Sequence, residues 1–220
     1  LPAAEPPSVR TGGSLVSQSV DTRLALLRAA ERLFATGGVG SVSLRRIAVE
    51  AGQGNHSAVL YHFVDKKDLV NAVLERHSGP IEAGWSIALG HLAAEGRDTL
   101  PELVGLMVRP LVAKLDDPDG GTDYLLVVAQ LVTSQSFPLV EMPATMAPGI
   151  LALTAAMMER MDRVPDALLP LRMMRVAAAM YCSIADYHRM TQLGMEIDRE
   201  DFVNDLIGSL TGLLQQRSAR

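Results

Sequence analysis

The sequence predicts an all-α protein in which an N-terminal helix-turn-helix unit precedes a larger helical body. Apolar residues recur at the three- and four-residue spacing of amphipathic helices along most of the chain, whereas no strand-like alternation continues beyond four residues. Aromatic residues make up only 4% of the composition while methionine occurs 11 times, a balance that favours packed helices over sheets.

The composition is that of an ordinary globular protein. The chain has 220 residues, of which 48% are hydrophobic and 20% charged. The single cysteine, Cys182, cannot form an internal disulfide, which fits the reducing cytoplasm. Residues 1–20 are rich in Pro, Gly and Ser and lack the pattern of a secretory signal, so we expect a flexible tail. No apolar stretch reaches the ~20 residues that cross a bilayer, so we expect a cytoplasmic protein without membrane contact.

Charge is distributed unevenly along the chain. The net charge is −5, but residues 1–78 hold 9 Lys and Arg against 7 Asp and Glu, and residues 79–220 hold 11 against 18. Binding to phosphates requires positive charge only where the protein touches them. A mildly basic N-terminal part on an acidic body therefore fits a local DNA-contact surface.

The first expected helix covers residues 21–35. Its apolar stripe consists of Leu26, Leu27, Ala30, Leu33 and Phe34. Gly37 and Gly38 follow, and glycine readily adopts the left-handed conformation that ends a helix.

Two short helices come next. One is expected over residues 44–51, with Ser43 as its N-cap and Gly52 at its end. A turn over 53–56 leads to the other, at 57–63. This layout of two short helices behind a longer one is that of a helix-turn-helix unit.

A fourth helix is expected to begin after Asp65, because Asp68 three residues on suits a helix N-terminus. Beyond Gly79 the pattern stays helical, with breaks at Gly96, at 116–121, at Pro138, at Pro165 and at Gly194. The expected helices of the body are 80–95, 98–115, 122–136, 145–162, 166–193 and 199–217.

Residues 21–76 closely resemble the DNA-binding domain of the tetracycline-repressor (TetR) family. The resemblance is carried by the pair Ala29-Ala30 with Leu33-Phe34, by Ser43, by Ile47-Ala48 with Ala51-Gly52, by the triplet Tyr61-His62-Phe63, and by Lys66 with Asp68-Leu69. It implies a DNA-binding domain over 21–78 and a helical effector-binding and dimerisation domain over 79–220. Two features depart from the family pattern: the turn after Gly52 is one residue longer, and Leu60 stands where members commonly have a tyrosine.

The resemblance implies that the helix at 57–63 enters the major groove of a palindromic operator. His56, Ser57, Leu60 and Tyr61 would then face DNA while Val59 and Phe63 hold the helix to the body. Arg45 and Arg46 would contact phosphates, although in a generic bundle they would form only a solvated face. His62 is expected to pack rather than to read a base. The predicted DNA-binding residues are Ser43, Arg45, Arg46, Asn55, His56, Ser57, Leu60, Tyr61 and Lys66.

The body is expected to pair with a second copy and to bind a small, largely apolar effector. A four-helix interface from the last two helices is predicted through Ala178, Tyr181, Val203, Leu206, Leu210 and Leu213, with Gly208 and Gly212 allowing close approach. The alternative is that this helix pair is a buried internal hairpin. The candidate ligand residues, each of which could instead be plain core, are Trp85, Met107, Tyr124, Gln130, Met157, Met158, Tyr181 and His188.

Enzyme chemistry finds no support in the sequence. There is no glycine-rich phosphate loop, no metal-type spacing of His and Cys, and no nucleophile elbow, so we expect no catalytic residues, metal or cofactor. The sequence therefore predicts a DNA-binding transcriptional regulator, as a repressor that its ligand releases. The alternatives are a related ligand sensor or protein-interaction module without DNA recognition, and a small all-helical enzyme.

Overall fold

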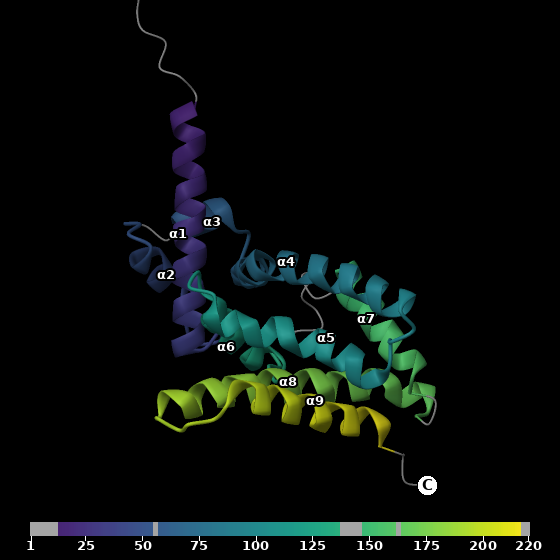
Figure 1. Cartoon of the computed structure of the whole chain (residues 1–220). Helices are drawn as coiled ribbons and strands as arrows, with labels where there is room; N and C mark the ends of the chain where they lie inside the picture. The colour runs from purple at the N-terminus through teal and green to yellow at the C-terminus, as the bar shows by residue number, and fades with distance from the viewer. Residues whose placement is uncertain (1–12, 55–56, 137–146, 162–163, 217–220) are drawn as a thin grey trace, which may run out of the picture.

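The computed structural model describes residues 13–54, 57–136, 147–161 and 164–216, and within these ranges the chain forms helices and short connections without any strand. The N-terminal unit, called the head below, consists of α1 (Gly13–Gly37), α2 (Leu44–Glu50) and α3 (Ser57–His62). It lies at one end of the molecule, with α1 projecting beyond the other helices (Figure 1). The all-α prediction is confirmed.

The first helix is longer than predicted. It begins at Gly13, so the flexible tail expected over residues 1–20 is too long, because residues 13–20 belong to α1. No proline or glycine interrupts residues 14–20, so nothing stops the helix from continuing toward the N-terminus. Residues 1–12 lie outside the described residues.

Side-chain caps start the two helices that come before and after α3. The Ser43 hydroxyl accepts a hydrogen bond from the backbone N–H of Arg46 at 3.2 Å, which starts α2 as predicted. The fourth helix starts with a reciprocal cap, in which Asp65 accepts from the N–H of Asp68 at 2.8 Å and the Asp68 carboxylate accepts from the N–H of Val64 at 2.9 Å.

That fourth helix, α4 (Lys66–Ala94), runs without a break through Gly79 and Pro80, whereas the sequence analysis expected a separate helix over 80–95. Proline removes one helical hydrogen bond, but the buried face of α4 continues on both sides of it through Val73, His77, Ile81 and Trp85. The packing of these four buried residues, which are spaced four apart, outweighs the helical hydrogen bond that Pro80 cannot make. The predicted boundary between residues 78 and 79 therefore falls inside a helix that the head and the body share.

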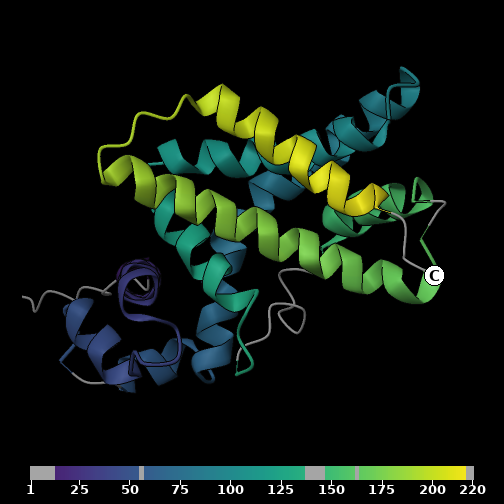
Figure 2. The same cartoon turned by 90° about the horizontal axis from the view of Figure 1, so that it is seen from below.

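The body comprises α5 (Leu100–Ala113), the short 3₁₀ turn η1 (Lys114–Asp116), α6 (Gly121–Leu131), α7 (Pro148–Glu159), a second turn η4 (Asp166–Leu168), α8 (Leu169–Gln192) and α9 (Arg199–Gln215). Figures 1 and 2 show α8 and α9 side by side as one outer layer. Behind this layer α5 packs on α9 and α6 packs on α8, and α6 also contacts α1. A continuous buried apolar cluster extends from Leu26 in α1 to Leu214 in α9, so head and body share one core.

Candidate nucleic-acid interface

The recognition helix α3 is held by its inner face and exposed on its outer face. Val59 and Phe63 are buried against the head, as predicted. On the opposite side Tyr61 is 80% exposed and Leu60 49% exposed, and Ser57 at the start of the helix is also exposed. Two of the predicted base-reading residues, Asn55 and His56, lie outside the described residues. The described part of α3 thus presents the surface that the sequence predicted.

Basic side chains flank this surface. Arg45 and Arg46 lie exposed on α2, directly after the Ser43 cap. Lys66 at the start of α4 is half-buried, and its ammonium group donates to the backbone carbonyl of Gly40 at 3.0 Å and lies 5.8 Å from the centre of the Phe34 ring. Burial lowers the pKa of Lys66. The ammonium group of Lys66 would therefore serve two roles: it bonds the turn between α1 and α2, and it is the predicted phosphate contact.

His62 is half-buried at the end of α3. Its ring lies edge-on to Tyr61 with 5.0 Å between centroids, and burial together with the positive charge of Arg23 lowers its pKa. The Arg23 guanidinium also lies 5.1 Å from the centre of the Phe63 ring. Sequence reasoning missed Arg23, because the contact joins α1 to the end of α3 and leaves no mark in either helix's own pattern.

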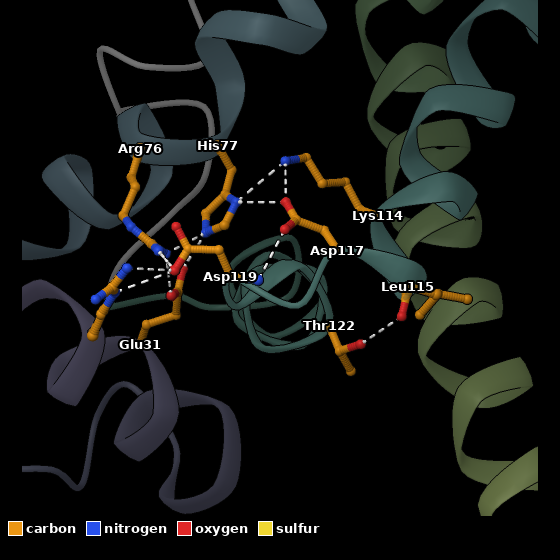
Figure 3. Close-up of polar contacts among 9 residues, drawn as sticks. Glu31, Arg76, His77, Lys114, Leu115, Asp117, Asp119 and Thr122 are labelled. Atoms are coloured by element: carbon orange, nitrogen blue, oxygen red, sulfur yellow. Dashed lines mark hydrogen bonds and ion pairs between the residues drawn. The ribbon is translucent and has the colours of Figure 1, made fainter.

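A buried ionic cluster joins the head to the body (Figure 3). Glu31 of α1, only 2% exposed, pairs with Arg76 of α4 at 2.6 Å and accepts from His77 Nε2 at 2.6 Å. Arg76 also pairs with Asp119, at 2.5 Å, in the loop before α6. Gly120 in that loop has a φ of +91°, and a Cβ there would collide with the Glu31 carboxylate, so both backbone and space require glycine.

The far side of His77 faces the same loop. Lys114 lies 3.4 Å from Nδ1 of His77 and donates to Asp117 at 2.8 Å, and the imidazole stacks on Tyr124 of α6 with 4.9 Å between centroids. Charged residues from α1, α4 and the loop before α6 therefore compensate one another inside the protein. No local sequence pattern predicts this cluster, because its members are far apart along the chain.

Gln130 does not belong with the candidate ligand residues. Its amide nitrogen donates to the carbonyls of Phe34 and Ala35 at 3.0 and 3.3 Å, and its oxygen accepts from the N–H of Val39 at 3.0 Å. The side chain therefore leaves α6 toward the head and not toward the interior of the body. We correct the prediction accordingly: helical spacing placed Gln130 on α6 but could not show which neighbour its side chain meets.

Four other candidate ligand residues lie in the interior of the body. Trp85 is buried and donates its indole N–H to the carbonyl of Leu106 at 3.0 Å, and Met107, Tyr124 and Met157 are buried as well. A hydrogen bond joins the Tyr124 and Tyr181 hydroxyls, and burial raises the pKa of Tyr124 to about 12 and that of Tyr181 well above its usual range.

Glu82 of α4 is a polar residue of this region that sequence reasoning missed. Its carboxylate accepts from the backbone N–H of Ile150 at 3.0 Å and from that of Gly149, at the start of α7. Burial raises the pKa of Glu82, and these two hydrogen bonds oppose the rise. Its negative charge also contributes to the raised pKa values of Tyr124 and Tyr181. The remaining two candidates, Met158 and His188, are half-buried. Burial raises the pKa of Asp123 on α6, and the charge of His188 opposes that rise.

The predicted pairing face of α9 is partly wrong. Val203, Leu206 and Leu210 are buried inside the protomer, because this stripe of α9 packs on α5. An apolar stripe shows which face of a helix is buried but not which partner buries it. The opposite face of α9 carries Gly208, Gly212 and the 39% exposed Leu213, and a Cβ added to either glycine would meet no atom within 4 Å.

The outer face of α8 adjoins that of α9. Its exposed and half-exposed residues include Leu171, Met174, Ala178, Tyr181 and Ala185. By length and composition alone, residues Asp166–Gln192 could cross a membrane, and only 22% of their apolar window is buried within the protomer. The outer layer of the body therefore exposes apolar and small residues together with polar ones, among them Arg175 of α8 and Asp205 and Ser209 of α9.

An exposed recognition helix beside a basic helix, held by a helical body, defines the class of helix-turn-helix DNA-binding proteins. Residues 26–73 match the model of the bacterial regulatory proteins of the tetR family. The N-terminal part of the chain is therefore similar to the DNA-binding domain of TetR-family transcription regulators, and the predicted resemblance is confirmed.

Solved structures share the fold over most of the chain. A TetR family transcription regulator from Marinobacter aquaeolei VT8 is 18% identical, with a TM-score of 0.58, covering 90% of this chain and 97% of that one. The fatty acid degradation regulator FadR from Bacillus halodurans is 13% identical, with a TM-score of 0.56 over 94% and 97%. A TetR-family regulator from Mesorhizobium loti MAFF303099 is 15% identical, with a TM-score of 0.50 over 90% and 96%. No curated protein matches the chain.

Proposed function

We propose that the protein is a homodimeric, cytoplasmic repressor that binds a palindromic operator and leaves it when a small, largely apolar ligand binds the body. The observation that carries this proposal is the exposure of Tyr61 and Leu60 on a helix whose inner residues, Val59 and Phe63, are buried in the head. A helix fixed on one side and bare on the other is suited to insertion into a major groove.

The arrangement of charge supports the same interpretation. Arg45 and Arg46 lie exposed beside α3 and would contact phosphates, while Ser43 and Lys66, which also hold the head together, would add contacts of their own. Asn55 and His56 remain the proposed base readers of the turn, together with Ser57. The phosphate contacts would set the register of the protein on DNA, and the turn and α3 would read sequence.

Dimerisation supplies the second recognition helix. We assign the pairing surface to the outer faces of α8 and α9, through Ala178, Gly208, Gly212 and Leu213, because this outer layer has no covering element among the described residues. Tyr181 would contribute its ring from the edge of this surface. Small side chains allow two helices of one protomer to approach two of the other closely, as in a four-helix bundle.

The interior of the body is the proposed effector region. Trp85, Met107 and Met157 supply apolar surface, and the hydroxyls of Tyr124 and Tyr181 supply hydrogen bonds near the Glu82 carboxylate. Met158 and His188 would lie at its margin. Glu82 and Trp85 lie on α4, the helix that also reaches the head, so a ligand here would act directly on the element that positions α3.

Selection of binding sites from a library of random duplexes tests the proposal. We expect the full-length chain to enrich a two-fold symmetric sequence, and its affinity for that sequence to fall steeply with salt, because phosphate contacts release counterions. A reporter gene behind the selected sequence should be silenced by the protein. Enrichment of no sequence would contradict DNA recognition, and would favour the alternative that Leu60 and the longer turn suggest, a ligand sensor of the same fold. Activation of the reporter would contradict repression.

A further inference from the structure

The side chain of Gln130 on α6 forms hydrogen bonds with the backbone at the end of α1. Helix α1 ends at Gly37, and in its last turn the carbonyl of Phe34 also accepts from the backbone N–H of Gly38 at 3.0 Å. The amide nitrogen of Gln130 donates to the carbonyls of Phe34 and Ala35, and the amide oxygen accepts from the N–H of Val39, just beyond the helix. A residue of the body thus caps a helix of the head.

This cap lies next to the turn that leads from α1 into α2 and α3. The chain passes from Val39 through a short turn into α2, and from α2 into α3. Lys66 of α4 holds the same turn at the Gly40 carbonyl, and Gly38, with a φ of +87°, bends the chain there. The orientation of α2 and α3 on the body therefore depends on a turn that is hydrogen-bonded both by Gln130 and by Lys66.

Ion pairs that tie α1 to the loop before α6 lie about one to two turns earlier along α1, at Glu31 and Arg28. The ionic cluster joins Glu31 to the loop at the start of α6, whereas Gln130 acts near the end of α6 and the end of α1. Two separated attachments fix an angle between two helices, and one attachment leaves a pivot. Removing the Gln130 bonds would leave the turn after α1 held by the Lys66 bond to Gly40, and the rest of the head held by the ion pairs of Glu31 and Arg28 and by apolar packing.

We propose that Gln130 is a positioning residue for DNA recognition: it fixes the angle of the head on the body and thereby sets the spacing between the two half-sites that the dimer accepts. The proposal rests on the function proposed above, since it requires a dimer that reads two half-sites. It concerns the geometry between the heads and not the bases that each head reads.

Synthetic duplexes test this role. The half-site selected by the wild-type chain is placed in inverted pairs at the selected spacing and at spacings one base pair shorter or longer, and affinities are measured for the wild type, Gln130→Met and Gln130→Glu. Methionine keeps the length and helix propensity of the side chain but makes none of the three bonds. Glutamate keeps the acceptor for Val39 but sets a carboxylate against two carbonyls.

We expect both variants to select the same half-site as the wild type and to lose spacing discrimination. The ratio of affinity at the best spacing to affinity at its neighbours should fall roughly fivefold or more. Thr133→Ala is the matched control: it lies exposed at the end of the same helix, and its hydroxyl bonds only the carbonyl of Gln130, so its spacing profile should equal that of the wild type.

A lower melting temperature with an unchanged spacing profile would overturn the proposal, because it would reduce Gln130 to a structural contact. If the variants do not fold, hydrogen exchange of the wild type decides. The Val39 N–H must exchange as slowly as the amides within α6, and exchange at the rate of an unprotected turn would overturn the proposal. Absence of any selected sequence would instead refute the proposed function itself, so the two failures are distinguishable.

Discussion

The recognition surface on α3 and the outer face of α8 and α9 are both exposed in the protomer, but they expose different chemistry. Leu60 and Tyr61 lie exposed on α3, and Arg45 and Arg46 lie exposed on the contacting helix α2, which suits a groove lined by phosphates. The α8–α9 face exposes small and apolar residues such as Gly208, Gly212 and Leu213, which would suit the same face of a second copy. Exposed apolar residues alone do not identify a partner; the charges and the side-chain sizes beside them do.

The sharpest way to break this comparison is to place a charge on the α8–α9 face. Gly212→Glu should convert the dimer to a monomer, because a buried carboxylate without a partner is costly, while the protomer tolerates it since a Cβ there meets no atom within 4 Å. Loss of two-site binding should lower operator affinity about a hundredfold or more. Sedimentation and gel-shift measure the two effects. Gly90→Glu on α4, equally open, is the control, and a Gly212 variant that stays dimeric would refute the assigned interface.

The joint between the two surfaces should be the most sensitive point for stability. Glu31→Ala leaves Arg76 and His77 buried without their carboxylate, which should cost about 3–5 kcal/mol in the free energy of unfolding. Urea unfolding of the intact chain measures it. Asp186→Ala breaks an exposed pair with Arg189 and should change stability little. Equal effects of the two substitutions would show that the buried cluster carries no special weight.

On the recognition surface the expected effect is on affinity and not on stability. Tyr61→Ala removes a side chain that is 80% exposed, so the melting temperature should stay the same while operator affinity falls about tenfold. Fluorescence anisotropy with the selected duplex measures the change. Ile87→Ala, an exposed apolar residue of α4 in the body, should leave DNA affinity untouched. An unaffected Tyr61 variant would remove α3 as the reading helix.

The smallest expected effect is a pH dependence inside the body. Because burial raises the folded-state pKa of Glu82, the folded protein holds that proton to higher pH than the unfolded chain does. The contribution of Glu82 to stability should therefore be present below its unfolded pKa and be lost as pH rises from about the ordinary value of 4.5 through the raised one. Glu82→Gln, whose oxygen can still accept from Ile150, should flatten this part of the curve of urea midpoint against pH. An unchanged slope would contradict the burial argument.

The sequence by itself determined the helices and the head. Caps such as Ser43 and Asp65, and apolar stripes such as that of α1, act within a few residues, so a local pattern contains all that decides them. The motif from Ala29 to Leu69 predicted the family resemblance and the inner and outer sides of α3 for the same reason. Local signals failed where packing competed with them: α4 continues through Pro80, because its buried stripe outweighs one missing hydrogen bond.

Only the tertiary structure decided which partner each side chain meets. The stripe of Val203, Leu206 and Leu210 pointed correctly to a buried face of α9, but these residues are already buried within the protomer, where α9 packs on α5 and α8. Gln130 lies 91 residues from Val39, and Glu31 lies 45 residues from Arg76. Such bonds depend on where whole helices come to rest against one another, and no periodicity within a single helix encodes that.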